Sequence, residues 1–161
     1  MSFPKRHKYG HVRPQHLRAQ GDPEVYADSM RWSPAKNISG VGLLESRAHC
    51  DERGFLQRVF DSEFIADQGM QFDVQQTNIS LMRKAGTVKG MHLQVSPSRE
   101  HKLVSCVKGA IFDVALDLRK DSATFGAWEA WNLGESARAS LFIPPGVAHG
   151  MQSLEDETLV Y

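Results

Sequence analysis

The sequence predicts an all-β domain, and two observations carry this prediction. Short runs rich in β-branched and aromatic residues follow one another from residue 37 onward, separated by clusters of Gly, Pro, Asp and Ser. Apolar and polar residues alternate within the runs, and the regular exchange of strands and helices that builds parallel sheets is missing. Many short antiparallel strands in a chain of 161 residues form a sandwich, a jelly roll or a barrel.

The expected strands lie at fairly regular intervals. In order, they cover residues 38–44, 54–60, 72–82, 86–95, 102–109, 110–118, 127–133, 139–145 and 158–161. Residues 61–68 are predicted to form a helix, with Asp61 or Ser62 as the N-cap, because either side chain can accept a hydrogen bond from the first free N–H groups. We expect one domain over residues 37–161, preceded by a poorly ordered extension over residues 1–36.

Composition excludes several classes of protein. Nineteen Lys and Arg balance nineteen Asp and Glu, and a net charge of zero argues against binding to nucleic acid. No stretch approaches the roughly 20 apolar residues that span a membrane, and the basic start of the chain lacks the apolar run of a secretory signal. Cys50 and Cys106 are therefore interpreted as reduced thiols of a cytoplasmic protein.

Alternation with a period of two assigns side chains to the faces of the strands. It places Gln76 and Asn78 on one face of their strand, and Asp113 and Asp117 on one face of theirs. The face opposite the two aspartates is apolar and consists of Phe112, Val114, Leu116 and Leu118. The polar faces either meet solvent or line a pocket inside a small barrel, and periodicity does not decide between these alternatives.

Two segments, residues 86–94 and 144–149, are close to the two consensus motifs of the cupin barrels. In those motifs three histidines and an acid bind a metal ion. Here Gln94 takes the place of one histidine, and only Glu100 loosely fills the position of the acid. Two imidazoles and an amide make a poor metal site, so we expect none, although a metal-dependent cupin enzyme remains an alternative.

Seven motifs, taken together, give a more specific match. They are DERGFL (51–56), QTNIS (76–80), KGMHLQ (89–94), KLV (102–104), FDVALDLR (112–119), TFGAW (124–128) and PPGVAHGM (144–151). In this order and spacing, the chain from about Ile38 to its last residue resembles the dTDP-4-dehydrorhamnose 3,5-epimerase family of sugar-nucleotide epimerases. The resemblance implies a cupin-like jelly roll, no cofactor, a homodimer in which the partner completes each pocket, and a role in deoxysugar or polysaccharide biosynthesis, such as that of lipopolysaccharide.

The family inverts carbons flanking the ketone of a nucleotide-linked 4-keto-6-deoxyhexose. Such chemistry needs a base for the proton next to the ketone and a cation or hydrogen-bond donor for the enolate oxygen. By position, the resemblance implies that His92 is the base and that Lys102 stabilises the enolate. The implied substrate-binding residues are Arg53 towards the mouth of the barrel, Gln76, Asn78, Lys89 and His149.

The sequence also departs from the family pattern. Lys89 stands where the family has arginine, and parity turns it away from His92, so we expect it to reach round to the diphosphate or not to contribute. The family's general acid is a tyrosine thirteen residues after His149, at position 162, and a shift of one residue makes Tyr161 a poor substitute. We therefore expect either a fragment of a longer protein or a remnant that binds sugar nucleotide with little turnover.

Overall fold

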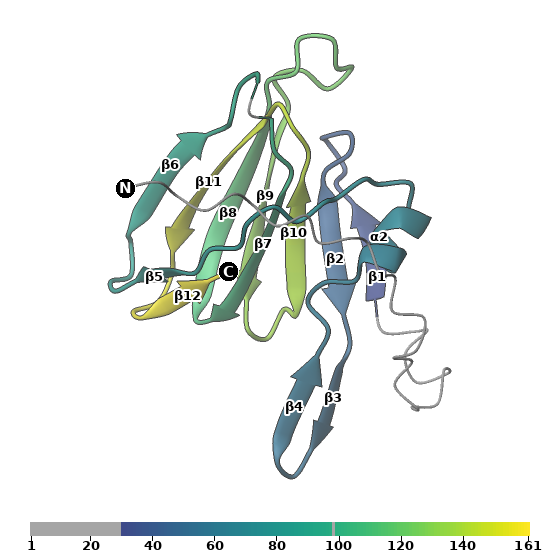
Figure 1. Cartoon of the computed structure of the whole chain (residues 1–161). Helices are drawn as coiled ribbons and strands as arrows, with labels where there is room; N and C mark the ends of the chain where they lie inside the picture. The colour runs from purple at the N-terminus through teal and green to yellow at the C-terminus, as the bar shows by residue number, and fades with distance from the viewer. Residues whose placement is uncertain (1–29, 98) are drawn as a thin grey trace, which may run out of the picture.

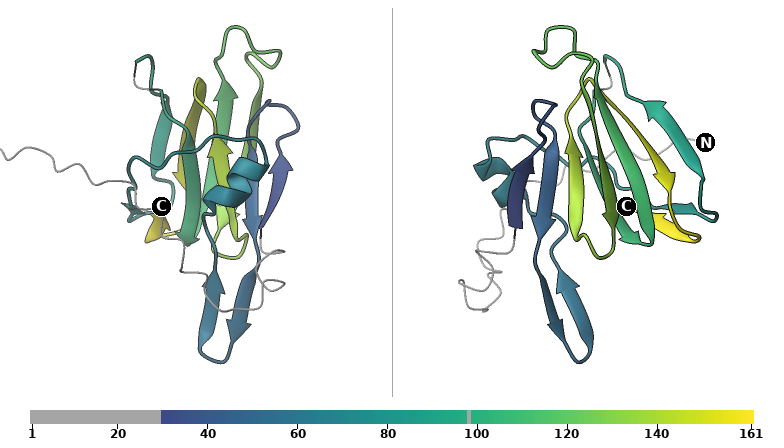
Figure 2. Two further views of the ribbon diagram at one scale, coloured as in Figure 1. Left: turned by 45° about the vertical axis from the view of Figure 1, so that its right-hand side comes forward. Right: turned by 180° about the vertical axis from the view of Figure 1, so that it is seen from behind.

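The computed structural model describes residues 30–97 and 99–161, which form two antiparallel β-sheets and a projecting hairpin (Figures 1 and 2). The larger sheet contains, in spatial order, β1 (Met30–Pro34), β2 (Gly42–Ser46), β10 (Ala139–Ile143), β7 (Lys102–Lys108), β12 (Thr158–Val160) and β5 (Ser80–Met82). The smaller sheet contains β6 (Val88–His92), β11 (Val147–Ser153), β8 (Ala110–Asp117) and β9 (Trp128–Gly134). This arrangement confirms the predicted all-β, cupin-like jelly roll.

The hydrophobic core lies between the two sheets. Val104 and Leu141 contribute to it from the larger sheet, and Ile111 and Val147 contribute from the smaller one. All four side chains are buried, and their strands alternate between core residues and residues that face outward. Each strand therefore has an inner and an outer face, and the site residues can be assigned to one or the other.

On β8 the polar face is the inner one. Asp113 and Asp117 are both fully buried, whereas Phe112 and Leu118, which belong to the apolar face seen in the sequence, are each 40% exposed. A carboxylate tolerates burial only when partners inside the protein replace its water. Both aspartates have such partners, so the structure decides that this polar face lines the interior.

The predicted helix is present as α2 (Ser62–Asp67), a single element of six residues. The side chain of Asp61 accepts hydrogen bonds from the backbone N–H groups of Glu63 and Phe64, which confirms Asp61 as the N-cap. It is the only helix in the part of the chain that the structure describes, and it is too short to cross a membrane.

Several strands differ from the prediction. The hairpin of β3 (Ala48–Asp51) and β4 (Gly54–Gln57) projects from the end of the barrel, where the sequence indicated one strand (Figure 1). β11 was not expected, because glycine and histidine obscure its alternation. β1 pairs with β2, so the sheet begins before the predicted domain boundary at residue 37. The predicted order of residues 1–29 lies outside the described residues.

Candidate functional site

Three polar side chains converge on the interior from three strands. Lys102 opens β7 and shares the inner face with Val104, and its partner across the sheet is the core residue Ile143. Asp113 and His149 lie on the inner faces of the neighbouring strands β8 and β11. The structure thus brings two predicted site residues, Lys102 and His149, to one side of the sheets, together with an aspartate that was not predicted to belong to the site.

Asp113 and His149 form a buried pair. The Nε2 atom of His149 lies 2.8 Å from Oδ1 and 2.9 Å from Oδ2 of Asp113, and the two residues are 2% and 0% exposed. Burial raises the pKa of Asp113, while the hydrogen bond and charge of His149, and then the charge of Lys102, act in the opposite direction. An ionised carboxylate can only accept, so Nε2 is the donor and Nδ1 is the nitrogen without a protein partner.

His92 stands beside this pair at the end of β6. It is the direct cross-strand neighbour of His149, and the centroids of the two rings are 5.9 Å apart. Its Nδ1 lies 3.0 Å from the carbonyl oxygen of Gly90. A carbonyl only accepts, so Nδ1 carries the hydrogen and the neutral ring keeps its lone pair on Nε2. The residue is exposed, as a group that meets a substrate at the mouth of a barrel must be.

Glu100, which the sequence offered as a loose metal ligand, lies instead beside Lys102. Its Oε1 is 3.5 Å from the lysine Nζ, and the side chains are 35% and 17% exposed. Among residues 30–97 and 99–161, no three His, Cys, Asp or Glu side chains lie close enough together to hold a metal ion. The carboxylate of Glu100 therefore faces an ammonium group.

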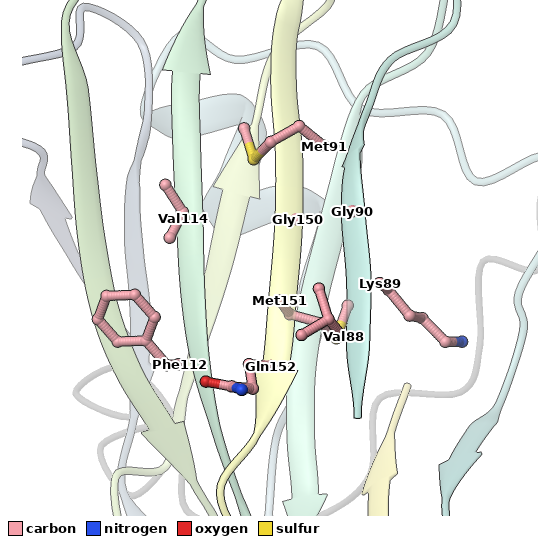
Figure 3. Close-up of a pocket in the computed structure, with 9 residues that line it drawn as sticks. All are labelled: Val88, Lys89, Gly90, Met91, Phe112, Val114, Gly150, Met151 and Gln152. Atoms are coloured by element: carbon pink, nitrogen blue, oxygen red, sulfur yellow. The ribbon is translucent and has the colours of Figure 1, made fainter. Parts of the chain in front are cut away.

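The structure corrects the predicted orientation of Lys89. His92 pairs with His149 and Lys89 pairs with Met151, so three steps along β6 correspond to two steps along β11. The extra residue is a β-bulge, which returns Lys89 to the face of His92. Its Nζ donates to the hydroxyl of Ser80 on β5, and its side chain extends away from the outer face of the sheet (Figure 3). The parity argument was wrong because strand parity does not survive a bulge.

The predicted strand over residues 72–82 is reduced to β5, and this changes the argument for Gln76 and Asn78. Both residues are exposed and lie before β5, in a segment without strand structure, so alternation does not assign them to a shared face. The pairing of β5 with β12 stops at Ser80 and Val160. In the same register, position 162 would be the cross-strand neighbour of Asn78.

Arg53 lies on the projecting hairpin and not at the mouth of its own barrel. It occupies the turn between β3 and β4, and its guanidinium donates to Asp51 at 2.6 Å. This ion pair lowers the pKa of Asp51 and raises that of Arg53. In Figure 1 the hairpin extends from one end of the barrel, whereas the end of β6 that carries His92 points to the other.

Tyr161 does not join the site residues. It exchanges two backbone hydrogen bonds of 2.8 Å with Ser105, and the preceding Val160 is buried in the core. Alternation therefore directs the side chain of Tyr161 to the outer face of the sheet. This agrees with the expectation that Tyr161 is not a substitute for a tyrosine one position later.

A groove of about 280 Å³ lies on the outer face of the smaller sheet (Figure 3). Its walls include Val88 and Met91 of β6, Phe112 and Val114 of β8, and Gly150 of β11. Lys89 and Met151 also line this groove, whereas His149 and Asp113 lie on the opposite face of the strands that carry them.

Comparisons with known proteins agree with the motifs. A family model described as dTDP-4-dehydrorhamnose 3,5-epimerase matches residues 35–161. A curated relative of that name from Sinorhizobium fredii is 37% identical over 137 residues, which cover 85% of this chain and 67% of the relative. One from Shigella flexneri is 40% identical over 121 residues, which cover 74% and 66%. The chain thus spans about two thirds of the length of these relatives.

Solved structures show the same likeness. The dTDP-4-dehydrorhamnose 3,5-epimerase of Bacillus anthracis, with TDP and PPi bound, matches with a TM-score of 0.78 at 35% identity, covering 82% of this chain and 75% of that one. The dTDP-6-deoxy-D-glucose-3,5-epimerase of Legionella pneumophila, in complex with dTDP-4-keto-L-rhamnose, gives 0.75 at 32% identity, covering 81% and 69%. A 3'-monoepimerase of Streptomyces bikiniensis, in complex with dTDP-quinovose, gives 0.66 at 31% identity, covering 75% and 62%.

Proposed function

Because the chain belongs to the dTDP-4-dehydrorhamnose 3,5-epimerase family, we propose that it epimerises a dTDP-linked 4-keto-6-deoxyhexose in deoxysugar biosynthesis. The observation that carries the proposal is the group formed by His92, His149 and Lys102 on the inner faces of the sheets. Of the ligands named for the structural relatives, dTDP-4-keto-L-rhamnose belongs to this class, and dTDP-quinovose is a dTDP-linked 6-deoxyhexose without the ketone. Cys50 and Cys106 are both free, which supports a cytoplasmic location.

His92 acts as the base in this proposal. The hydrogen bond from Nδ1 to the carbonyl of Gly90 keeps the lone pair on Nε2, and the exposed position leaves that atom accessible to a sugar ring. Removal of a proton next to the ketone breaks a C–H bond, and its electron pair forms the C–C double bond of an enolate. The proton then resides on Nε2, and the carbon is inverted when solvent water donates a proton to the opposite face and the resulting hydroxide takes up the proton on Nε2.

Lys102 and His149 serve the sugar in different ways. The enolate places negative charge on the former ketone oxygen, and a largely buried ammonium stabilises such charge more than an exposed one does. The unpartnered Nδ1 of His149 can accept a hydrogen bond from a sugar hydroxyl while Asp113 holds Nε2. Lys89, on the same face as His92, offers a charge for the diphosphate.

Proton exchange with solvent tests the proposal directly. The protein is incubated with dTDP-4-keto-6-deoxyglucose in heavy water, and deuterium at C3 and C5 is followed by NMR. We expect incorporation that His92→Asn reduces by at least about 100-fold, because the base is lost. The control is Glu135→Gln, an exposed glutamate that follows β9 and should leave exchange unchanged. Incorporation at C3 alone identifies a 3-epimerase, and incorporation at both carbons identifies a 3,5-epimerase.

Two outcomes would overturn the catalytic proposal. Binding of the nucleotide sugar without exchange would indicate a sugar-nucleotide-binding module. Absence of both binding and exchange, together with a metal ion present in stoichiometric amount, would favour a metal-dependent cupin enzyme.

We further propose that the protein is a homodimer in which each hairpin of β3 and β4 completes the site of the partner. The apolar Phe55 and Leu56 on this hairpin are 63% and 66% exposed, which is unfavourable unless another surface covers them. The arginine in its turn, Arg53, is suited to a diphosphate but stands away from its own barrel. An exchanged hairpin accounts for both features.

Mixed dimers test this arrangement. Light scattering should give twice the mass of the chain, and chains carrying His92→Asn and Arg53→Ala should complement each other. An exchanged hairpin gives the mixed dimer one site with both residues intact, so exchange activity returns. If each hairpin served its own barrel, the mixed dimer would have no intact site and activity would stay low.

A further inference from the structure

We propose that Glu100 is a positioning residue that draws the ammonium of Lys102 away from Asp113 and so reserves Asp113 for His149. Only the expected effect of Glu100 on catalysis depends on the proposed function. The arrangement of charges that it describes can be tested in the protein without substrate.

Two carboxylates of different kinds act on the charge of Lys102, and only Glu100 forms an ion pair with it. Glu100, half-buried, approaches its Nζ to 3.5 Å, and Asp113, fully buried, lies on the inner face towards which Lys102 points. The positive charge of Lys102 is one of the causes that oppose the rise in the pKa of Asp113. The lysine is therefore close enough to act on both acids, yet its recorded ion pair is with Glu100.

The two basic side chains compete for Asp113. A lysine ammonium is a compact charge on a flexible stem of four carbons, so it follows the strongest available attraction. Without Glu100, that attraction would come from Asp113, because a buried charge is weakly screened. Lys102 would then share the carboxylate with His149, and the imidazole would lose the undivided partner that fixes its orientation.

The distance between Lys102 and Glu100 suits a residue that orients the ammonium without forming a strong hydrogen bond with it. At 3.5 Å, Glu100 attracts the ammonium but does not form a short hydrogen bond with it. The three N–H donors of Lys102 thus stay available for a substrate oxygen. A tight, fully buried pair would instead have to be broken before the lysine could stabilise an enolate.

Glu100→Gln removes the charge while keeping the size of the side chain. The test is the long-range proton–nitrogen NMR spectrum of the histidine rings, with His149 assigned by its loss in His149→Gln. We expect Glu100→Gln to shift both ring nitrogens of His149. Glu135→Gln, an exposed glutamate next to the far end of β9, is the matched control and should leave them unchanged.

A double-variant cycle separates positioning from a general effect on the fold. In a Lys102→Met background the competitor is gone, so Glu100→Gln should no longer shift the His149 nitrogens. Glu100→Asp keeps the charge and should keep the wild-type spectrum, which also covers the case in which Glu100→Gln fails to fold. An unchanged spectrum in Glu100→Gln, or a full shift that persists with Met at 102, would overturn the inference.

Catalysis provides the second readout. If His92 and Lys102 act as proposed, Glu100→Gln should lower kcat for exchange by up to about 100-fold, the effect of displacing a catalytic group by about 1 Å, with KM little changed. If Glu100→Gln shifts the His149 nitrogens but the wild-type protein performs no exchange, the role of Glu100 is upheld and the proposed function is overturned. Exchange without a spectral response would do the reverse.

Discussion

Asp113 and Asp117 occupy the same face of the same strand, both fully buried, and yet their pKa values move in opposite directions. Burial dominates at Asp113 and raises its pKa, because His149 is its only side-chain hydrogen-bond partner recorded in the structure. At Asp117 the hydrogen bonds from Arg119, and then those from Ser122 and Thr124, outweigh burial and hold the pKa far below its usual range. Asp113 lies deeper in the protein and has fewer donors than Asp117, and both differences push the two pKa values apart.

The two environments have different roles. Asp117 accepts from the backbone N–H, Nε and Nη2 of Arg119, and Nη2 also donates to the carbonyl of Ser39. The arginine side chain in turn packs against Gly146, where an added Cβ would lie 2.6 Å from its Cγ and where φ is +84°. Asp117 thus ties three segments together, whereas Asp113 is left with spare acceptor capacity beside the site.

Replacement of Asp117 should have the largest effect on stability. Asp117→Asn leaves the Arg119 guanidinium without its counter-charge, and we expect unfolding by urea to show a loss of about 3 kcal/mol. Asp156→Asn is the control, because its ion pair with Lys84 is solvent-exposed and should contribute little to stability. A loss below about 1 kcal/mol for Asp117→Asn would show that the network does not stabilise the fold.

The pH dependence of stability should have opposite signs for Asp117 and Asp113. Asp117, whose pKa is lowered, contributes stability that is present above its ordinary value of 3.8 and is lost as the pH falls below it. Asp113, whose pKa is raised, contributes stability at low pH that is lost as the pH rises from 3.8 through its folded-state value. Each unit of pKa difference corresponds to about 1.4 kcal/mol.

Urea titrations from pH 3 to pH 7 on the wild type and on the two Asp→Asn variants check these signs. The difference between the wild type and Asp117→Asn should grow with pH up to about 4. The difference between the wild type and Asp113→Asn should decline above pH 4. Slopes of the same sign for both acids would contradict the comparison.

The sequence predicted most of the strands and two candidates for the N-cap, but it did not predict β1, β3, β11 or the inner faces. Asp61 could be named as one of the two N-cap candidates because capping is local. Alternation grouped Asp113 with Asp117 correctly but could not say that this face is buried, because the opposite face, with Phe112, is the more apolar of the two. Only the packing of one sheet on the other supplies that information.

For the site residues too, the sequence identified the residues but not the orientations that depend on strand pairing. His92, Lys102 and His149 followed from motifs, and the structure brings all three to the inner faces. The orientation of Lys89 depends on a bulge in the pairing of β6 with β11. The surroundings of Gln76 depend on the pairing of β5 with β12. Strand register belongs to two segments at once, so neither alone reveals it.

A smaller change to the Asp117 network tests whether its donors act separately. Ser122 donates from Oγ to Oδ2 of Asp117 at 2.7 Å, and Thr124 donates to the same oxygen at 2.7 Å. Ser122→Ala should therefore lower the free energy of unfolding by about 1 kcal/mol, since Thr124 and Arg119 still satisfy the carboxylate. A loss as large as that of Asp117→Asn would indicate that the donors form one cooperative unit.

The smallest effect on stability should come from Asp113→Asn. This change removes a buried carboxylate whose pKa is raised by burial, so the charge that it removes is poorly solvated in the folded protein. An asparagine Oδ1 can still accept from Nε2 of His149, so we expect the free energy of unfolding to change by less than about 1 kcal/mol. Because the asparagine Nδ2 can equally donate to Nε2, the ring of His149 should nevertheless lose its fixed tautomer, visible as broadened or shifted ring nitrogens in the NMR spectrum. A loss of stability comparable to that of Asp117→Asn would show that the pair of Asp113 and His149 supports the fold, and would remove the distinction between the two aspartates.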